Sequence, residues 1–217
     1  MTAASAKGNK ADKDDLRERV LRASLALIDE QGLAALSMRE VARRAGVSHQ
    51  APYHYFADRQ AILAAVAERG FGLLNDKLVQ ARAQAQGPTH TLELSAIAYV
   101  RFALENPACF RIMFRPELVK HSNYESLDCR ADQAFRHVPE MVMACMEAGL
   151  PKDIGVETMS VLLWSVVHGF AWLLIDGPLC EKLPTVAADQ NRAIGDLAHT
   201  IRRMVEATIA SAKSTTR

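Results

Sequence analysis

The segment from Gly46 to Phe56, GVSHQAPYHYF, combines hydrogen-bonding and aromatic side chains in a stretch too short and too polar to be a core helix. Glutamine can bind adenine through two hydrogen bonds, and alanine can contact the methyl group of thymine. Serine and histidine can also donate or accept hydrogen bonds. We therefore predict that the early residues of this segment contact base edges: Ser48, His49, Gln50 and Ala51.

The elements around this segment must present it to a nucleic acid. An apolar stripe at helical spacing predicts a first helix over 14–31, ended by Gly32. Ser37-Met-Arg-Glu40 has the pattern of a capping box, in which the serine accepts from a free amide and the glutamate bonds back. Gly46 suits a left-handed turn, and Ser48 would cap a second short helix. This order predicts a helix-turn-helix.

The second helix of a helix-turn-helix lies in the major groove. We expect Tyr53 and His54 to bond phosphates at its edge, while Phe56 turns inward. Because the segment has no lysine, other phosphate contacts must come from its neighbours: Ser37, Arg39, Arg43 and Arg59. The alternative is a helix hairpin inside a larger bundle, in which these arginines are ordinary solvated charges.

Proline at position 52 limits the second helix. Proline has no backbone N–H and is tolerated only in the first turn of a helix. The recognition helix is therefore expected to be short, or to begin near Gln50. Asp58 then caps a long helix that we expect to run to Ala85, where Gln86-Gly87-Pro88 breaks the pattern.

Residues Leu21–Leu63, LRASLALIDEQGLAALSMREVARRAGVSHQAPYHYFADRQAIL, resemble the DNA-binding domain of TetR-family transcriptional repressors. Pro52 stands where many members of that family have leucine. The resemblance implies an all-α homodimer, a palindromic double-stranded DNA operator, and an effector-binding C-terminal domain. The segments ENPACFRIMF (105–114) and WSVVHGFAWLLIDG (164–177) resemble one TetR subgroup with a Trp-x-x-x-His-Gly motif, whose effectors the sequence does not name.

A small-molecule effector would sit between helices, in a mostly apolar pocket with a few polar groups. The candidates are the aromatic and methionine side chains of the second half, together with one histidine: Phe102, Phe110, Met113, Phe114, Phe135, Met143, Trp164 and His168. Each could instead be plain core packing. His168 could orient a ligand, or it could bond a backbone carbonyl as a core histidine.

The run Met159–Ile175 is apolar on all sides but, at 17 residues, is shorter than a usual membrane span. We therefore expect a buried helix, with core on one side and a partner subunit on the other. A last helix over 186–211 has an apolar stripe that fits a dimer bundle, although packing within one chain is the alternative. The predicted dimer residues are Val167, Phe170, Leu174, Ile194, Leu197, Ile201 and Val205.

Composition narrows the classes of function. Apolar residues make up 49% and charged residues 24% of the 217, with few Gly and Pro, which favours an all-α soluble protein. The net charge of +1 does not by itself indicate nucleic-acid binding, so any basic surface must be local. The four cysteines lack metal-site spacing, and no cofactor or metal is expected.

Two other functions are alternatives to the regulator. An enzyme is not supported, because the chain has no Gly-rich phosphate loop, nucleophile elbow or HExxH motif. A helical adaptor that has lost DNA binding is favoured only by Pro52 and the lysine-free segment.

The full expectation is an N-terminal three-helix helix-turn-helix domain followed by a C-terminal helical bundle for ligand binding and dimerisation. The expected ranges are a disordered arm (1–13), the DNA-binding domain (14–70), the effector and dimerisation domain (71–212) and a flexible tail (213–217). We expect a cytoplasmic homodimeric repressor, without membrane contact, that a small apolar effector releases from DNA.

Overall fold

The computed structural model describes the backbone of residues 4–177 and 179–215, and the side chains of 15–177 and 179–214. Every regular element in these ranges is helical, which confirms the all-α prediction. The chain divides into two compact units. The N-terminal unit comprises the chain up to Gly70 together with Pro107–Asp128, and the C-terminal unit comprises Phe71–Asn106 together with the chain from Cys129 onward.

The N-terminal unit contains the predicted helix-turn-helix and one segment from the second half of the chain. Its core is formed by apolar faces that repeat at helical spacing, including the fully buried Val20, Leu27, Ile62 and Leu63. In chain order its elements are α1 (Ala4–Gln31), the 3-10 helix η1 (Leu33–Ala35), α2 (Met38–Ala45), the 3-10 helix η2 (Ala51–His54), the first part of α3 (Arg59–Gln84), α5 (Pro107–Met113) and the 3-10 helix η3 (His121–Asn123).

The inclusion of α5 in the N-terminal unit differs from the continuous division predicted at residue 70. Gly70 explains part of the packing, because a Cβ there would lie only 2.9 Å from Cys109 Cβ and 2.5 Å from Met113 Sδ. The absence of a side chain at this position lets α3 approach α5 closely. In addition, the backbone N–H of Ala108 donates a hydrogen bond to the carboxylate of Asp29 on α1.

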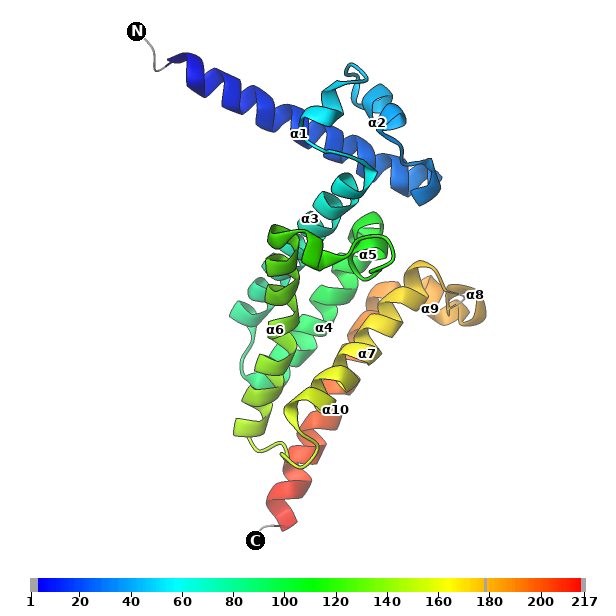
Figure 1. Ribbon diagram of the computed structural model, residues 1–217. Helices are drawn as coiled ribbons and strands as arrows, with labels where there is room; N and C mark the ends of the chain where they lie inside the picture. The colour runs from blue at the N-terminus through cyan, green and yellow to red at the C-terminus, as the bar shows by residue number, and fades with distance from the viewer. Residues whose placement is uncertain (1–3, 178, 216–217) are drawn as a thin grey trace. The chain divides into compact units, whose positions relative to one another are not determined.

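The C-terminal unit is built around α4 (Pro88–Glu105), which packs against both α7 (Val156–Ile175) and α10 (Gln190–Thr215), as Figure 1 shows. Short helices α8 (Leu179–Lys182) and α9 (Pro184–Ala188) connect α7 to α10. Near one end of this bundle, α6 (Glu125–Glu147) contributes Val142 and Cys145 to a core cluster that also contains Leu92 and Val205.

Two helix ends differ from the predicted ranges. Helix α1 begins at Ala4 rather than near Asp14, so 4–13 are helical instead of disordered; alanine and lysine in this stretch are strong helix formers. Helix α10 likewise continues through the predicted tail to Thr215. Positions 1–3 and 216–217 lie outside the described residues. Helix α6 runs through Pro139 without a break, because buried residues on both sides hold it in place.

Helix α7 is far more exposed than predicted. In the apolar window of this helix, only 17% of residues are buried, and Val161 and Leu162 are 59% and 55% exposed. By length and composition alone, α7 could cross a membrane, but the core helix of a soluble protein meets the same criterion, so one such helix is weak evidence. The apolar face therefore lacks a cover within the described part of the chain.

Candidate nucleic-acid interface and aromatic cluster

The helix-turn-helix corner forms as the sequence predicts. Ser37 caps α2, its Oγ accepting from the backbone N–H of Glu40 at 3.2 Å. Gly46 ends α2 in the left-handed region, with φ of 65°, a conformation that side-chain-bearing residues avoid. The N–H of Val47 then donates to the carbonyl of Ala42 at 3.1 Å, and the small Ala42 is buried at the corner.

The recognition segment is a 3-10 helix rather than the α-helix expected of a helix-turn-helix. An α-helix starting at Ser48 needs the N–H of residue 52 to donate to the Ser48 carbonyl, and Pro52 has none. The N–H of Ala51 donates to that carbonyl instead, at 3.0 Å. Tyr53 similarly donates to Gln50, at 3.1 Å. Because Pro52 cannot donate, the backbone hydrogen bonds of this segment join each N–H to the carbonyl three residues earlier, which is the 3-10 pattern.

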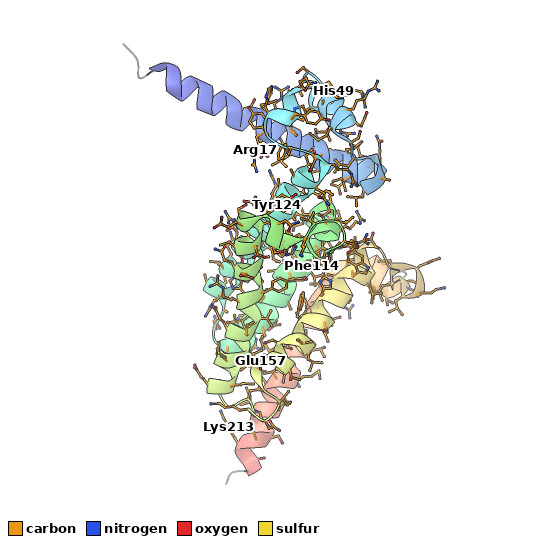
Figure 2. All side chains as sticks on the ribbon, in the orientation of Figure 1. Arg17, His49, Phe114, Tyr124, Glu157 and Lys213 are labelled. Atoms are coloured by element: carbon orange, nitrogen blue, oxygen red, sulfur yellow. The ribbon has the colours of Figure 1, made fainter. Side chains whose placement is uncertain are left out.

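Most of the predicted DNA-contacting side chains in this region are at the surface. Figure 2 labels His49, which is exposed and lies 6.0 Å from Tyr53 between ring centroids. The other exposed candidates are Ser37, Arg39, Arg43, Ser48, Gln50, Tyr53 and His54. Ala51 was predicted wrongly: it is buried inside the N-terminal unit, so its methyl group cannot contact a thymine. Phe56 turns inward as predicted.

Arg59, another predicted phosphate contact, is hydrogen-bonded within the chain. Its guanidinium donates from Nε to the carbonyl of Leu36 and from Nη2 to that of Leu33, both at 2.9 Å. These two hydrogen bonds fix the η1 connection to the start of α3. Arg43 is exposed but pairs with Glu40, which lies one turn back on α2. That pairing replaces the second half of the expected capping box, in which Glu40 would bond back to the cap.

A second group of residues forms an aromatic cluster around a buried tyrosine in the C-terminal unit. The hydroxyl of Tyr99 on α4 lies 2.8 Å from Nδ1 of His168 and accepts from the indole N–H of Trp164 at 3.4 Å. Phe135 meets Trp164 edge-on, with ring centroids 5.1 Å apart, and Trp172 stacks on His168 at 6.4 Å. We call Tyr99, Phe135, Trp164, His168 and Trp172 the aromatic cluster.

Nδ1 of His168 has a side-chain hydroxyl among its partners, a contact that neither of the two expectations for this histidine included. Burial lowers the pKa of His168 and raises that of Tyr99, so both groups are uncharged at neutral pH. Tyr99 was missed from the sequence. Its place on the buried face of α4 was a usable signal, since a buried tyrosine hydroxyl generally needs a partner.

The other predicted pocket residues are distributed over both units. Phe110, Met113 and Phe114 belong to the N-terminal unit, where Phe110 and Met113 are fully buried and Phe110 contacts Phe114. Phe102 is fully buried on α4. Met143 is 45% exposed on α6. For the three fully buried side chains, core packing accounts for their position.

Most of the predicted dimer residues pack within the chain itself. The side chains that the chain itself buries are Val167, Leu174, Ile194, Ile201 and Val205, whereas Phe170 and Leu197 are half-buried. The sequence stripe marked the face of α10 that packs on α4. The exposed apolar face of α7 contains Val161, Leu162, Val166 and Leu173, and Met204 is exposed on α10.

Comparison with known families agrees with this organisation. Residues 20–66 match the model described as bacterial regulatory proteins, tetR family, and residues 92–197 match the model described as tetracyclin repressor-like, C-terminal domain. The chain belongs to the TetR family. It is thus a DNA-binding transcription regulator of the helix-turn-helix type, and TetR-family regulators are generally not enzymes.

Individual TetR-family relatives resemble the chain to different extents. BetI of Rhizobium meliloti (strain 1021), an HTH-type transcriptional regulator, is 34% identical over 103 residues, covering 48% of this chain and only 46% of BetI. FasR of Mycolicibacterium smegmatis, an HTH-type transcriptional activator, is 25% identical over 203 residues, covering 89% of this chain and 88% of FasR. The structure of PfmR from Thermus thermophilus has a TM-score of 0.67 at 20% identity, covering 85% of this chain and 97% of PfmR, and shows the shared fold.

Proposed function

We propose that this TetR-family chain is a ligand-responsive repressor that binds a palindromic operator as a homodimer. A small, largely apolar effector would release it from DNA, and its C-terminal unit would belong to the Trp-x-x-x-His-Gly subgroup. Such a regulator works in the cytoplasm, where the DNA is. The observation that carries the proposal is the exposed row of hydrogen-bonding side chains after the α2 corner: Ser48, His49, Gln50, Tyr53 and His54.

The uncovered face of α7 supports the homodimer. Exposed large apolar side chains recur there at positions 162, 166 and 173, which share one helix face, and Val161 beside them is also exposed. A contiguous apolar surface of this kind marks an interaction site. Homodimers are typical of the family, and a twofold partner would cover the same face on both chains.

The proposed release mechanism requires two states of the dimer. In the DNA-bound state the two recognition segments would be about 34–36 Å apart, one turn of the double helix. Helix α3 contributes residues to both units of the chain, so it is the natural carrier of a change from the effector site to this spacing. The effector must bind the DNA-free state more tightly, since otherwise it shifts nothing.

Repression rather than activation is part of the proposal, and it rests on the usual behaviour of the family. The relative FasR is named an activator, so the sign of regulation needs its own measurement. Transcription from a promoter that carries the selected operator, with and without the protein, gives that sign directly.

The test of the proposal is selection of random duplex DNA on the purified full-length protein, followed by sequencing. A palindrome with half-sites about one helical turn apart is the expected result. The matched variants are His49→Ala and Tyr53→Ala, at exposed side chains of the recognition segment. They should weaken binding to the selected site without changing the thermal melt, because phosphate and base contacts are absent from the free protein.

One alternative remains testable in the same experiment. A helical adaptor without DNA binding is favoured by Pro52 and by the absence of lysine from the recognition segment. Enrichment of no sequence, or binding that only follows salt concentration, would overturn the regulator in favour of this alternative.

A further inference from the structure

The recognition segment has few cations of its own for the DNA backbone. It contains no lysine, so neighbouring arginines were expected to bind phosphates. Of these, Arg59 donates to two backbone carbonyls and Arg43 pairs with Glu40, while Arg39 is exposed. Because neutralised phosphates supply much of a protein's affinity for DNA, a chain that binds DNA as proposed needs further cations near this segment.

Helix α1 brings one such cation to the end of the recognition segment. Arg17, labelled in Figure 2, is exposed, and its guanidinium carbon lies 5.6 Å from the ring centre of Phe56. Phe56 is buried two residues after His54, the last residue of η2. A guanidinium above a ring uses its flat face for that contact and keeps its N–H groups at the edge, where they can bind a phosphate.

The next two arginines of α1 have different surroundings. Arg19 donates from Nη2 to the carbonyl of Ala45 at 2.9 Å, so it fastens α1 to the end of α2. Arg22 is exposed, as Arg17 is, but it lies five residues further along and therefore about 140° away around the helix axis. Among these three arginines, Arg17 is the exposed one that the structure places beside the recognition segment.

The register of α1 continues this positive charge towards the beginning of the helix. Because α1 begins at Ala4, positions 10, 13 and 17 are helical and lie within about 60° of one another around its axis. These positions are Lys10, Lys13 and Arg17, and they span about 10 Å along the helix. We call these three residues the basic strip.

The acidic residues of the same stretch lie mostly on other faces of α1. Asp12, Asp15 and Glu18 fall more than about 100° from the centre of the basic strip. Asp14 falls at its border, and Glu18 pairs with Arg69 on α3. The strip therefore has a net positive charge. Duplex DNA has a phosphate about every 3.4 Å of axis on each strand, so a strip of about 10 Å can contact more than one phosphate.

We propose that the basic strip of α1 binds the phosphate backbone of the DNA next to the bases that the recognition segment contacts. This inference deepens the proposed function and rests on it, because the partner is the same double-stranded operator. Arg17 binds a phosphate through the edge of its guanidinium while Phe56 holds its flat face. Lys10 and Lys13 bind neighbouring phosphates as point charges. Such contacts raise the affinity for DNA without selecting its sequence.

The experiment measures the affinity of the full-length protein for the selected duplex at salt concentrations from about 50 to 200 mM. Each lost phosphate contact should reduce the salt slope by about 0.9, so affinity should fall about 3.5-fold less across this range for each contact. We expect Arg17→Gln to lose one contact per half-site and the double variant Lys10→Gln/Lys13→Gln to lose two. The sequence that each variant enriches should stay the same.

Arg22→Gln is the matched control, because it removes the same charge from an exposed arginine on another face of the same helix. It should leave the salt slope unchanged, whereas Arg17→Lys keeps the charge and should keep the slope. Glutamine forms helices about as well as lysine and arginine, so helix content should not change in any variant. A wild-type slope in Arg17→Gln or in the double lysine variant, or an equal loss in Arg22→Gln, overturns the proposal.

Failure of the basic strip can be distinguished from failure of the proposed function. If the selection yields a palindrome but the strip variants keep the wild-type slope, the regulator stands and the strip falls. If no sequence is enriched, the same slopes are measured on a duplex of random sequence. A loss in the strip variants, but not in Arg22→Gln, then retains the strip as a backbone contact while operator binding falls. A protein that binds neither duplex overturns both.

Discussion

At the residue scale, two arginines that look alike in the sequence should behave differently. Arg39 is exposed, whereas Arg59 donates two hydrogen bonds to carbonyls of the η1 connection. Arg39→Ala should leave the melt unchanged and reduce the salt slope of DNA binding by about 0.9 per half-site. Arg59→Ala should lower the free energy of unfolding by roughly 1.5–3 kcal/mol and leave that slope unchanged. Each variant is the other's control. If Arg59→Ala instead reduced the salt slope and left the free energy of unfolding unchanged, Arg59 would be assigned to the DNA interface.

His168 gives a pH prediction at the same scale. Burial lowers its pKa below the ordinary value of 6.5, so below pH 6.5 the unfolded chain takes up a proton that the folded chain does not. The free energy of unfolding should therefore fall as pH falls from 6.5 towards the folded pKa. His168→Gln removes this titration, and urea unfolding at about pH 7.5 and pH 5.5 should show a smaller loss than in the wild type. His137, whose pKa burial also lowers, supplies part of what remains. An unchanged pH dependence in the variant would contradict this assignment.

What the sequence could predict about single residues depends on how far away their partners lie. Ser37 and Gly46 were predicted correctly because their roles involve neighbours three or four positions along the chain. Arg59 bonds carbonyls 23 and 26 positions away, and Tyr99 meets a histidine 69 positions away. A local pattern can place such a residue on a buried face, but it does not name a partner so far along the chain, so these hydrogen bonds were not predicted.

At the element scale, the close approach of α5 to α3 can be tested through two glycines. In Gly70→Ala the new Cβ would lie 2.9 Å from Cys109 Cβ, which is fixed to the α5 backbone. The overpacking, about 1–3 kcal/mol, should exceed the gain of up to about 1 kcal/mol from replacing a helical glycine. In Gly72→Ala the nearest atom is Arg130 Nη1 at 3.6 Å, an ordinary contact, so that variant should gain stability. Urea unfolding that shows both variants stabilised would contradict the tight packing.

The sequence predicted elements better than their details. The order of helices through the α2 corner was correct, because caps and glycines mark where helices begin and end. The 3-10 form of η2 follows from one missing amide at Pro52, whereas the other interior proline, Pro139, leaves α6 unbroken. The sequence shows that a proline disfavours a continuous helix. Whether the helix continues through it depends on tertiary packing.

At the scale of the whole molecule, hydrophobic periodicity predicted that α7 and α10 have apolar stripes but not which stripe meets a partner. On α10 the strongest stripe packs within the chain, because α4 covers it. On α7 the chain covers one face and leaves another apolar, so a helix that is apolar on all sides has two surfaces to bury. Assigning each surface requires the tertiary structure.

The exposed apolar face of α7 is expected to be the dimer interface. Leu162, 55% exposed on α7, should lie within the dimer interface, where a buried carboxylate without a partner is costly. Leu162→Glu should therefore reduce the mass in sedimentation from that of two chains to that of one, 23.9 kDa, while helix content stays the same. Val79→Glu is the matched control, since Val79 is 56% exposed on α3, and that variant should remain a dimer. A wild-type protein that sediments as a monomer, or that needs detergent to stay in solution, would mean that this face is covered by something other than a second copy.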